Sequence, residues 1–437
     1  MNWLAAQEAL LGALAPGHEP RVRRMAARVH KGFEFPFRVA EAPALVPADI
    51  FALDCAAVLE RLRPLLAHEF LGAARQAVPE RFRAAASRRP RFFATDFARA
   101  FHADGSLRHP MPELQSFPGN YFLWKAQLPP TLEDMTRAGF PGGGHGFGFA
   151  GADELDAFLQ DVILAGSDPA LAAIIEIEPL KQKTFVDAFL MARTLGIVLV
   201  DPRDLETGAD GTLEARRWIS AEEAGPCQHQ GSRKIERAHV RCLPDELDAA
   251  GFDTRALTRI FRTPEERARV SFSVHPEDFF LVSKATLAGA DLDPPLLAAD
   301  EELLERLAAM GLALAEGVLK PVDGAGGRGV LGVRERLSAA DVRAVVVPRG
   351  KKATHLWQQR YEAHRFSRRC MPEAGDPAGA VQQELRIMWV LPDGAHEPRV
   401  AGSMVRWSEP GELSSAGRAR ALGTGTQTPV IVPAGTF

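Results

Sequence analysis

The sequence predicts an α/β protein, in the broad sense that includes α+β folds, with a helical N-terminal region ahead of a parallel sheet. Apolar residues recur at helical spacing through the first 90 residues. A strand–helix–strand pattern occupies residues 172–201, and such a unit implies parallel strands with ligands at their carboxyl ends. A further strand near residue 320 runs directly into a glycine-rich turn. These three observations indicate several packed domains and a ligand site at strand ends.

The composition restricts the class of protein. A chain of 437 residues is too long for one ordinary core, so we expect two or three domains. No run of about 18 apolar residues occurs, which argues against a membrane span. The net charge of −4 argues against a nucleic-acid partner. Four scattered cysteines form no C-x-x-C pair, so we expect a reducing cytoplasm and neither a disulfide framework nor a zinc site.

Between residues 91 and 241 we expect several strands and one helix. The segment from 205 to 233 is polar, and we expect it to be irregular rather than stranded. The expected elements, in order, are a strand at Arg91–Phe97, a strand at Ala172–Ile177, a helix at Thr184–Leu195, a strand at Ile197–Val200 and a strand at Arg237–Arg241.

The layout resets after residue 287, where a helix precedes a new set of strands. A hairpin is expected near the end of the chain, because Pro392–Gly394 supplies turn residues between two apolar-alternating runs. The expected elements are a helix at Ala299–Glu316, a strand at Val318–Pro321, a helix from Ser338, a strand at His355–Gln359, the paired strands Gln383–Val390 and Arg399–Trp407, and a last strand at Pro429–Val432.

The strand that delivers Lys320 is followed at once by Gly324, Gly326, Gly327 and Gly329. Glycines allow positive φ and let backbone N–H groups close around phosphate oxygens, while the lysine adds one point charge. A P-loop places its lysine after the glycines, and a Rossmann fingerprint starts a helix at the turn, so this order differs from both. We interpret it as a triphosphate site. The alternative is a glycine-rich hairpin that binds nothing.

Polar residues on flanking segments support the nucleotide interpretation. Upstream, the apolar run Phe280–Ser283 ends in Lys284, which we place at a strand-to-helix junction. Downstream, Gln358, Gln359 and Tyr361 belong to a segment that looks like a strand whose backbone hydrogen-bonds to adenine.

Glu384 and Arg386 are two residues apart on an expected strand, so their side chains share one face. A charged pair on the inner face of a hairpin indicates a site if the other face packs. The alternative is an ordinary exposed ion pair.

The collinear order of these segments resembles the glutathione synthetase and glutathionylspermidine synthase group of ATP-grasp ligases, and more closely a bacterial set of uncharacterised ATP-grasp-like proteins. The resemblance implies an ATP-grasp fold with a helical region at 1–90, a central substrate domain at 91–280 and a nucleotide-binding domain at 281–437. The segments that carry it are Pro112–Gln115, Glu178–Thr184, Arg237–Arg241, Val282–Lys284, Leu319–Pro321 with its glycines, and Gly402–Arg406.

The same resemblance implies a magnesium site. Family members use a Glu-x-Asn at a strand end, and this chain has Glu113 and Gln115 there. Side chains two apart on a strand point the same way, and their oxygens suit a hard cation. The third ligand implied is Asp323, one residue earlier and shorter than the usual glutamate.

The remaining implied site residues bind nucleotide or substrate. Lys284 and Lys320 match the lysines on the nucleotide phosphates, and Glu384 matches the acid that meets the nucleotide. The residues implied for substrate are Gln182, Arg241, Arg386 and Arg406, of which Arg241 and Arg406 join Lys320 as catalytic; a closing loop is implied at Gly423–Thr428.

The function implied is an ADP-forming carboxylate–amine ligase that uses ATP and Mg²⁺ and passes through an acyl phosphate. Its partners would be a small carboxylate and an amine, amino-acid or peptide-like, with no nucleic acid or membrane and with a homodimer left open. One alternative is an ATP-dependent phosphotransferase on the same scaffold. Another is a nucleotide-binding protein without turnover, since Gln115, Asp323 and Ser408 depart from the family pattern.

Overall fold

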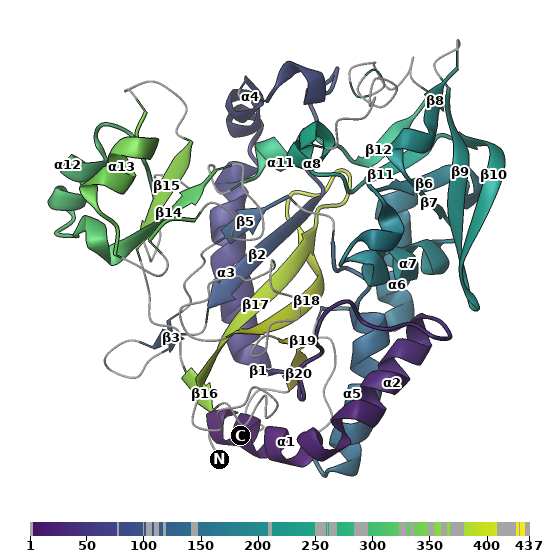
Figure 1. The fold of residues 1–437 in the computed structure, drawn as a ribbon, viewed down its shortest axis with the longest axis horizontal. Helices are drawn as coiled ribbons and strands as arrows, with labels where there is room; N and C mark the ends of the chain where they lie inside the picture. Colours follow the sequence, from purple (N-terminus) through teal and green to yellow (C-terminus); the bar gives the residue numbers. More distant parts are fainter. Residues whose placement is uncertain are drawn as a thin grey trace.

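The protein combines helices with several β-sheets in an α+β arrangement (Figure 1). The computed structural model describes residues 3–76, 78–98, 100–101, 107–108, 113–116, 119–140, 147–208, 212–249, 259, 261, 269–283, 296–322, 330–332, 336–347, 354–359, 365–367, 380–408, 425–427 and 429–432. Among these residues, no helix is both long and apolar enough to span a membrane.

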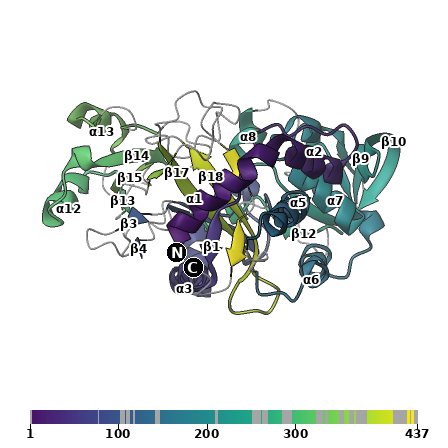
Figure 2. The same ribbon diagram turned by 90° about the horizontal axis from the view of Figure 1, so that it is seen from below.

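Helices dominate the first part of the chain. Viewed from below, α1 and α2 run across the lower end of the molecule (Figure 2). Strand β1 (Leu45–Pro47) pairs in parallel with β20 (Val430–Val432), which ties the beginning of the chain to its end. The helices are α1 (Trp3–Leu14), α2 (His18–Val29), α3 (Ala48–Leu65), α4 (His68–Gln76), α5 (Trp124–Arg137) and α6 (Ala152–Leu164).

The central sheet has the strand order β10-β9-β7-β6-β11-β12, with β8 beside β9. Its β6, β7, β11 and β12 strands are parallel, and α7 (Phe185–Leu195) crosses from β6 to β7, so the predicted strand–helix–strand unit is confirmed. Helix α8 (Pro244–Ala249) follows β11. The strands are β6 (Ala172–Ile175), β7 (Val198–Val200), β8 (Leu205–Thr207), β9 (Leu213–Glu222), β10 (Gly225–Ile235), β11 (Arg237–Val240) and β12 (Ser271–Val274).

The expectation that 205–233 is irregular was wrong. Two long antiparallel strands, β9 and β10, form a hairpin there and extend the central sheet beyond its parallel part. Most positions of β10 are exposed or half-buried, so its side chains face water and its sequence is polar. An antiparallel extension that packs on one face only does not need the apolar run that marks a buried parallel strand.

A second sheet, which we call sheet A, has the order β19-β18-β17-β2-β5, with β16 beside β17. It joins segments almost 300 residues apart, since β2 pairs with β17. The predicted hairpin of β17 and β18 is confirmed. The strands of sheet A are β2 (Phe92–Ala98), β5 (Glu113–Gln115), β16 (Arg365–Ser367), β17 (Ala380–Val390), β18 (Arg399–Ser408) and β19 (Gly425–Gln427); a separate pair is β3 (Ala100–Phe101) and β4 (Leu107–Arg108).

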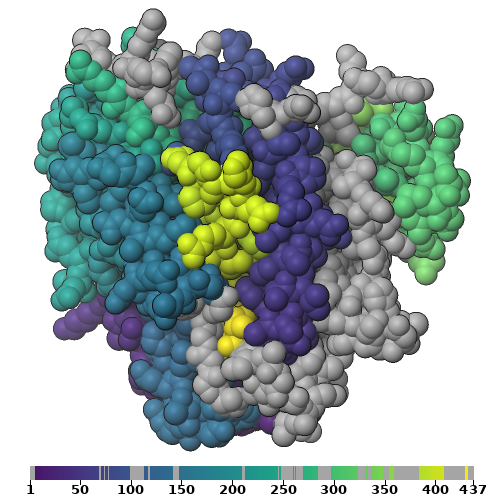
Figure 3. All heavy atoms as spheres, turned by 180° about the vertical axis from the view of Figure 1, so that it is seen from behind, coloured from purple at the N-terminus to yellow at the C-terminus, as the bar shows by residue number. Residues whose placement is uncertain are grey.

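The turn of this hairpin fixes sheet A between the N-terminal and central parts. Seen from behind, the end of the hairpin (yellow-green) lies between α3 (dark blue) and the segment that contains α6 (Figure 3). Arg63 of α3 donates a hydrogen bond to Glu397 at 2.6 Å, and the guanidinium of Arg399 stacks over Phe149, 4.1 Å from its centroid. The hairpin is therefore held from both sides.

A third sheet of three strands, sheet E, forms a lobe at the side of the molecule (Figure 1). One of its faces packs Leu319 and Trp357 against helices α12 and α13. The elements are β13 (Leu296–Ala298), α12 (Leu303–Ala309), β14 (Gly317–Pro321), α13 (Ala339–Val345) and β15 (His355–Gln359).

Two expectations about this part of the chain were wrong. The helix expected over Ala299–Glu316 is only two turns long, because the chain reverses at Gly311, whose φ is +67°. The strand expected at Phe280–Ser283 does not form, because its first two residues belong to a single helical turn, α11 (Asp278–Leu281). The carboxylate of Asp278 accepts the backbone N–H of His275 at 3.1 Å, which favours a turn at this point.

Gly317 is required by the packing of sheet E. A Cβ at Gly317 would lie 2.2 Å from the indole ring of Trp357, which is fully buried. The indole Nε1 donates to the carbonyl of Leu314 at 3.1 Å, so the ring has no room to withdraw. We expect Gly317→Ala to lower the free energy of unfolding by about 1–3 kcal/mol in urea titrations. The matched Gly12→Ala in α1, where a Cβ meets nothing within 4 Å, should cause no loss, and equal midpoints for both would contradict this packing.

Candidate functional site

One face of sheet A carries a row of charged and polar side chains, which we call the charged face: Asp96, Glu113, Gln115, Glu384, Arg386 and Arg406. The strand register brings them together. Asp96 on β2 lies opposite both Glu113 on β5 and Arg386 on β17, and Glu384 lies opposite Arg406 on β18. Directly opposed residues of an antiparallel pair share a face, so residues from four strands contribute to one surface.

The other face of sheet A is apolar. Phe97, Leu385 and Val405 alternate with the charged positions and are fully buried in the main hydrophobic core. Since strand residues alternate between faces, packing one set into the core fixes the direction of the other set. The prediction that Glu384 and Arg386 share a face whose reverse side packs is therefore confirmed by the register and burial of β17.

A buried carboxylate organises the charged face. The Nε and Nη2 atoms of Arg386 donate to the two carboxylate oxygens of Asp96, both at 2.6 Å. The Nη2 atom of Arg406 donates to Asp96 at 2.7 Å and also to Glu384. Arg386 is almost fully buried, whereas the side chain of Arg406 is 18% exposed. Arg406 is thus the arginine of this pair that an incoming molecule can reach.

The pairing of Asp96 with its arginines shifts the pKa values of Asp96 and Arg386. Burial works to raise the pKa of Asp96, but the charges and hydrogen bonds of Arg386 and Arg406 outweigh it and hold the pKa well below its ordinary value. Burial works to lower the pKa of Arg386, and the charge of Asp96, with a further contribution from Glu113, more than reverses it. Arg386 therefore stays charged and Asp96 stays deprotonated throughout the physiological range.

Glu113 and Gln115 lie at the edge of the same face and are both half-buried. Their side chains share a face by strand alternation, and both offer oxygen donors, which is the chemistry a hard cation such as Mg²⁺ takes. The oxygen donors of these two residues fit a magnesium site. The third predicted ligand, Asp323, lies outside the described residues.

The predicted nucleotide residues belong to sheet E. Lys320 on β14 lies opposite Leu356 on β15, and Gln358 lies opposite Val318, so Lys320 and Gln358 share the face turned away from α12 and α13. Leu356 on that face belongs to the main core, so this face meets the body of the molecule. Gln358 is 1% exposed, and its amide Nε2 makes no hydrogen bond with the described part of the chain. A buried donor of this kind is available to a ligand.

Other predicted nucleotide residues cannot be placed in this way. Gln359 ends β15, and its side chain is not among those described. Lys284, Gly324, Gly326, Gly327, Gly329 and Tyr361 lie outside the described residues.

The central-sheet residues predicted for substrate have internal partners. Arg241 is fully buried and donates to Asp187 at 2.7 Å and to Glu176 at 3.2 Å. Asp187 in turn accepts the backbone N–H groups of residues 120, 122 and 123. Gln182 donates to the carbonyl of Ile177 at 2.7 Å. Arg241 thus joins the central sheet to the chain that follows β5.

Asp96 was missed by sequence reasoning, although a signal for it exists. It is the one charged residue in the strand Phe92–Ala98, all of whose residues are buried. A carboxylate in such a strand requires a cationic partner, because an unpaired buried charge costs far too much. Its partners, Arg386 and Arg406, come from the C-terminal hairpin, which no local pattern connects to β2.

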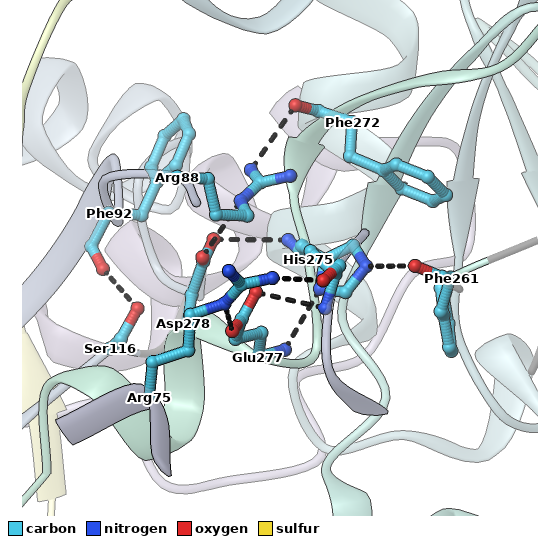
Figure 4. Close-up of polar contacts among 10 residues, drawn as sticks. Arg75, Arg88, Phe92, Ser116, Phe261, Phe272, His275, Glu277 and Asp278 are labelled. Atoms are coloured by element: carbon cyan, nitrogen blue, oxygen red, sulfur yellow. Dashed lines mark hydrogen bonds and ion pairs between the residues drawn. The ribbon is translucent and has the colours of Figure 1, made fainter. Parts of the chain in front are cut away.

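A second group of charges, in which the carboxylates are buried, joins residues 75–88 to residues 275–278 (Figure 4). Arg75 pairs with Glu277 at 2.7 Å, and Arg88 pairs with Asp278 at 3.1 Å. Burial raises the pKa of Asp278 to about 6, and it lowers the pKa of His275 well below its ordinary value. The Nδ1 atom of His275 accepts the N–H of Glu277, so this imidazole is neutral with its proton on Nε2.

This second group borders a cavity of about 330 Å³ lined by His275 and by arginines that pair with neighbouring acids or carbonyls. Because its charges satisfy one another, we assign it to docking of the two regions. The charged face of sheet A is the stronger candidate site, since it joins an accessible arginine to oxygen donors suited to a cation.

Comparison with known proteins supports the fold. No family model matches the sequence, and no curated protein matches it. Among solved structures, a glutathione synthetase-like effector from Globodera pallida, in its apo form, matches with a TM-score of 0.56 and 10% sequence identity. The match covers 98% of this chain and 98% of that one. The chain therefore has a glutathione synthetase-like fold.

Proposed function

We propose that the protein is an ATP-dependent carboxylate–amine ligase. The observation that carries this proposal is the charged face of sheet A, where Asp96 fixes two arginines beside Glu113 and Gln115. Such a surface combines a guanidinium that can bind an anion with oxygen donors that can bind a cation. A ligase that uses magnesium-ATP and a carboxylate substrate requires both. The glutathione synthetase-like fold, which matches over 98% of the chain, also supports the proposal of a ligase.

Each residue has a defined part in this proposal. Arg406, the more accessible of the two arginines, binds the substrate carboxylate, and Arg386 holds Asp96 in place. Lys320, Gln358 and the glycine turn 324–329 bind the nucleotide. Glu113 and Gln115, together with Asp323, would hold Mg²⁺, which when bound neutralises charge on the phosphates.

The reaction then needs no protein nucleophile. A substrate carboxylate oxygen forms a bond to the γ-phosphorus of ATP while the bond to the ADP oxygen breaks, giving ADP and an acyl phosphate. An amine nitrogen next attacks the acyl carbon, inorganic phosphate leaves, and the amine releases a proton. Arg406 stabilises the negative charge that develops on the acyl oxygen, and the aligned binding groups bring the reactants together.

ADP release measured over a panel of small acids, each with and without a panel of amines, tests this function. A ligase should release ADP in step with a new amide, detected by mass spectrometry as the sum of acid and amine less water. A stable phosphorylated acid that forms without amine would replace the ligase by a phosphotransferase. ATP binding with no ADP from any pair would instead indicate a nucleotide-binding protein without turnover.

The magnesium role of Glu113 has its own test. We expect Glu113→Ala to raise the Mg²⁺ concentration for half-maximal ADP release by about tenfold or more, because one oxygen ligand is lost. Magnesium titrations of ADP release at saturating ATP measure this shift. The control is Glu397→Ala, which removes an exposed glutamate paired with Arg63. An unchanged magnesium requirement in Glu113→Ala would remove Glu113 from the site.

A further inference from the structure

The β9–β10 hairpin of the central sheet presents a second group of ligand-type side chains, far in sequence from the charged face. Ser220 and Glu222 lie two apart on β9, and Cys227 and His229 lie two apart on β10. The register pairs Cys227 with Ser220, so strand alternation places all four side chains on one face of the hairpin. Glu222 is exposed, whereas Cys227 and His229 are half-buried.

Three of these side chains converge. One carboxylate oxygen of Glu222, the Sγ of Cys227 and a ring nitrogen of His229 all lie within 4.8 Å of one another. The hydroxyl of Ser220 lies between two of them, 2.8 Å from Nε2 of His229 and 2.9 Å from Oε1 of Glu222. The hydroxyl oxygen of Ser220 thus contacts both Glu222 and His229, so these two candidate metal ligands point toward a common position.

Neighbouring residues hold the histidine in this direction. The indole of Trp218 stacks on the ring of His229, with centroids 5.6 Å apart and planes 13° from parallel. Trp218 itself lies against Gly231, where a Cβ would come within 3.4 Å of the indole. Two paired strands with a short turn therefore present the ligands on a preformed scaffold.

The donor set selects the kind of ion. Thiolate, imidazole and carboxylate together are the ligands of Zn²⁺ and related transition ions, whereas Mg²⁺ and Ca²⁺ take oxygen donors. Three protein ligands leave a fourth tetrahedral position for water. We propose that Glu222, Cys227 and His229 form a binding site for a zinc-class divalent ion on the β9–β10 hairpin. The absence of a C-x-x-C pair had argued against zinc, but here the donors converge by cross-strand pairing.

Zinc titration of the full-length, chelator-treated protein against a chromophoric competitor tests the site. We expect one Zn²⁺ per chain in wild type, and cobalt substitution should add a thiolate-to-cobalt charge-transfer band. Cys227→Ser should abolish the band and weaken zinc binding by about tenfold or more, and His229→Gln should weaken it to a similar extent. Bound zinc should also raise the unfolding temperature of wild type but not of Cys227→Ser.

Two control variants separate a metal site from a hydrogen-bonded cluster. Cys55→Ser, which removes a half-buried cysteine on α3, should leave the cobalt band and the zinc affinity unchanged. Ser220→Ala breaks the Glu222–Ser220–His229 hydrogen bonds but keeps all three ligands, so it should retain zinc. The site is refuted if wild type takes up no zinc, if Cys227→Ser and His229→Gln both bind like wild type, or if Ser220→Ala alone abolishes binding.

Discussion

Replacing Lys320 by alanine should weaken ATP binding by about 10- to 150-fold and remove ADP release, while the protein stays folded. The estimate is the loss of one hydrogen bond to a charged group, about 1.5–3 kcal/mol, which converts to this range in Kd. Lys320 is the penultimate residue of β14, on the face of sheet E that meets the body of the molecule, and it precedes Gly324 by four positions in the sequence. Its ammonium is the one strand-borne charge that the nucleotide proposal places on the phosphates.

Calorimetric titration with a non-hydrolysable ATP analogue measures the effect, and thermal unfolding checks the fold. Lys234→Ala is the matched control, because Lys234 also lies on a strand, β10 of the β9–β10 hairpin, and pairs with Glu236. Lys320→Arg should not restore full affinity, since a planar guanidinium differs in shape from an ammonium. Wild-type affinity in Lys320→Ala would exclude the phosphate role.

The second large effect is expected at Asp96. Asp96→Asn should lower the free energy of unfolding by about 3–5 kcal/mol, because it leaves two arginines without their shared carboxylate. It should also remove ADP release from the molecules that remain folded, since Arg406 loses its orientation. Urea unfolding measures the loss of stability. The rate of ADP release divided by the fraction of folded protein measures the loss of activity separately.

The pH dependence of this difference follows from the sign of the shift. The folded pKa of Asp96 is held below its ordinary value, so the stabilisation is fully present above the unfolded pKa and is lost as pH falls through the folded one. The stability gap between wild type and Asp96→Asn should therefore be constant down to about pH 4 and shrink below it. A gap that already shrinks between pH 7 and pH 5 would contradict the ion-pair account.

Asp134 provides the matched control for Asp96. It is a buried carboxylate that pairs with Arg21 at 3.0 Å, Arg24 at 2.5 Å and Arg137 at 2.8 Å, all on helices α2 and α5 and none on a strand of sheet A. Asp134→Asn should cost stability for the same reason but leave the activity of the folded fraction intact. Equal activity losses in the two variants would mean that Asp96 acts only through stability.

Local patterns predicted those elements whose residues are neighbours in sequence. The strand–helix–strand unit around α7 and the β17–β18 hairpin depend on short-range periodicity and turn residues, and both were confirmed. The β9–β10 hairpin was missed because an exposed antiparallel strand lacks an apolar run. Helix α12 was overestimated because the expected helix ran through Gly311, whose positive φ reverses the chain.

The site was predictable in its parts and not in its assembly. The spacing of Glu384 and Arg386 indicated that these two side chains share a face, and the spacing of Glu113 and Gln115 indicated the same for that pair. Nothing local connects β2 with β17, because their pairing joins residues about 290 positions apart and is decided by packing of the whole core. The central role of Asp96 therefore emerged only from the sheet register.

A crystal structure with Mg²⁺ and a non-hydrolysable ATP analogue tests the central claim most directly. The account predicts that the triphosphate contacts Lys320 on one side and the Glu113–Gln115 edge of the charged face on the other, with Arg406 left to bind a carboxylate. An analogue bound elsewhere, with Lys320 and Glu113 both remote from its phosphates, would contradict it.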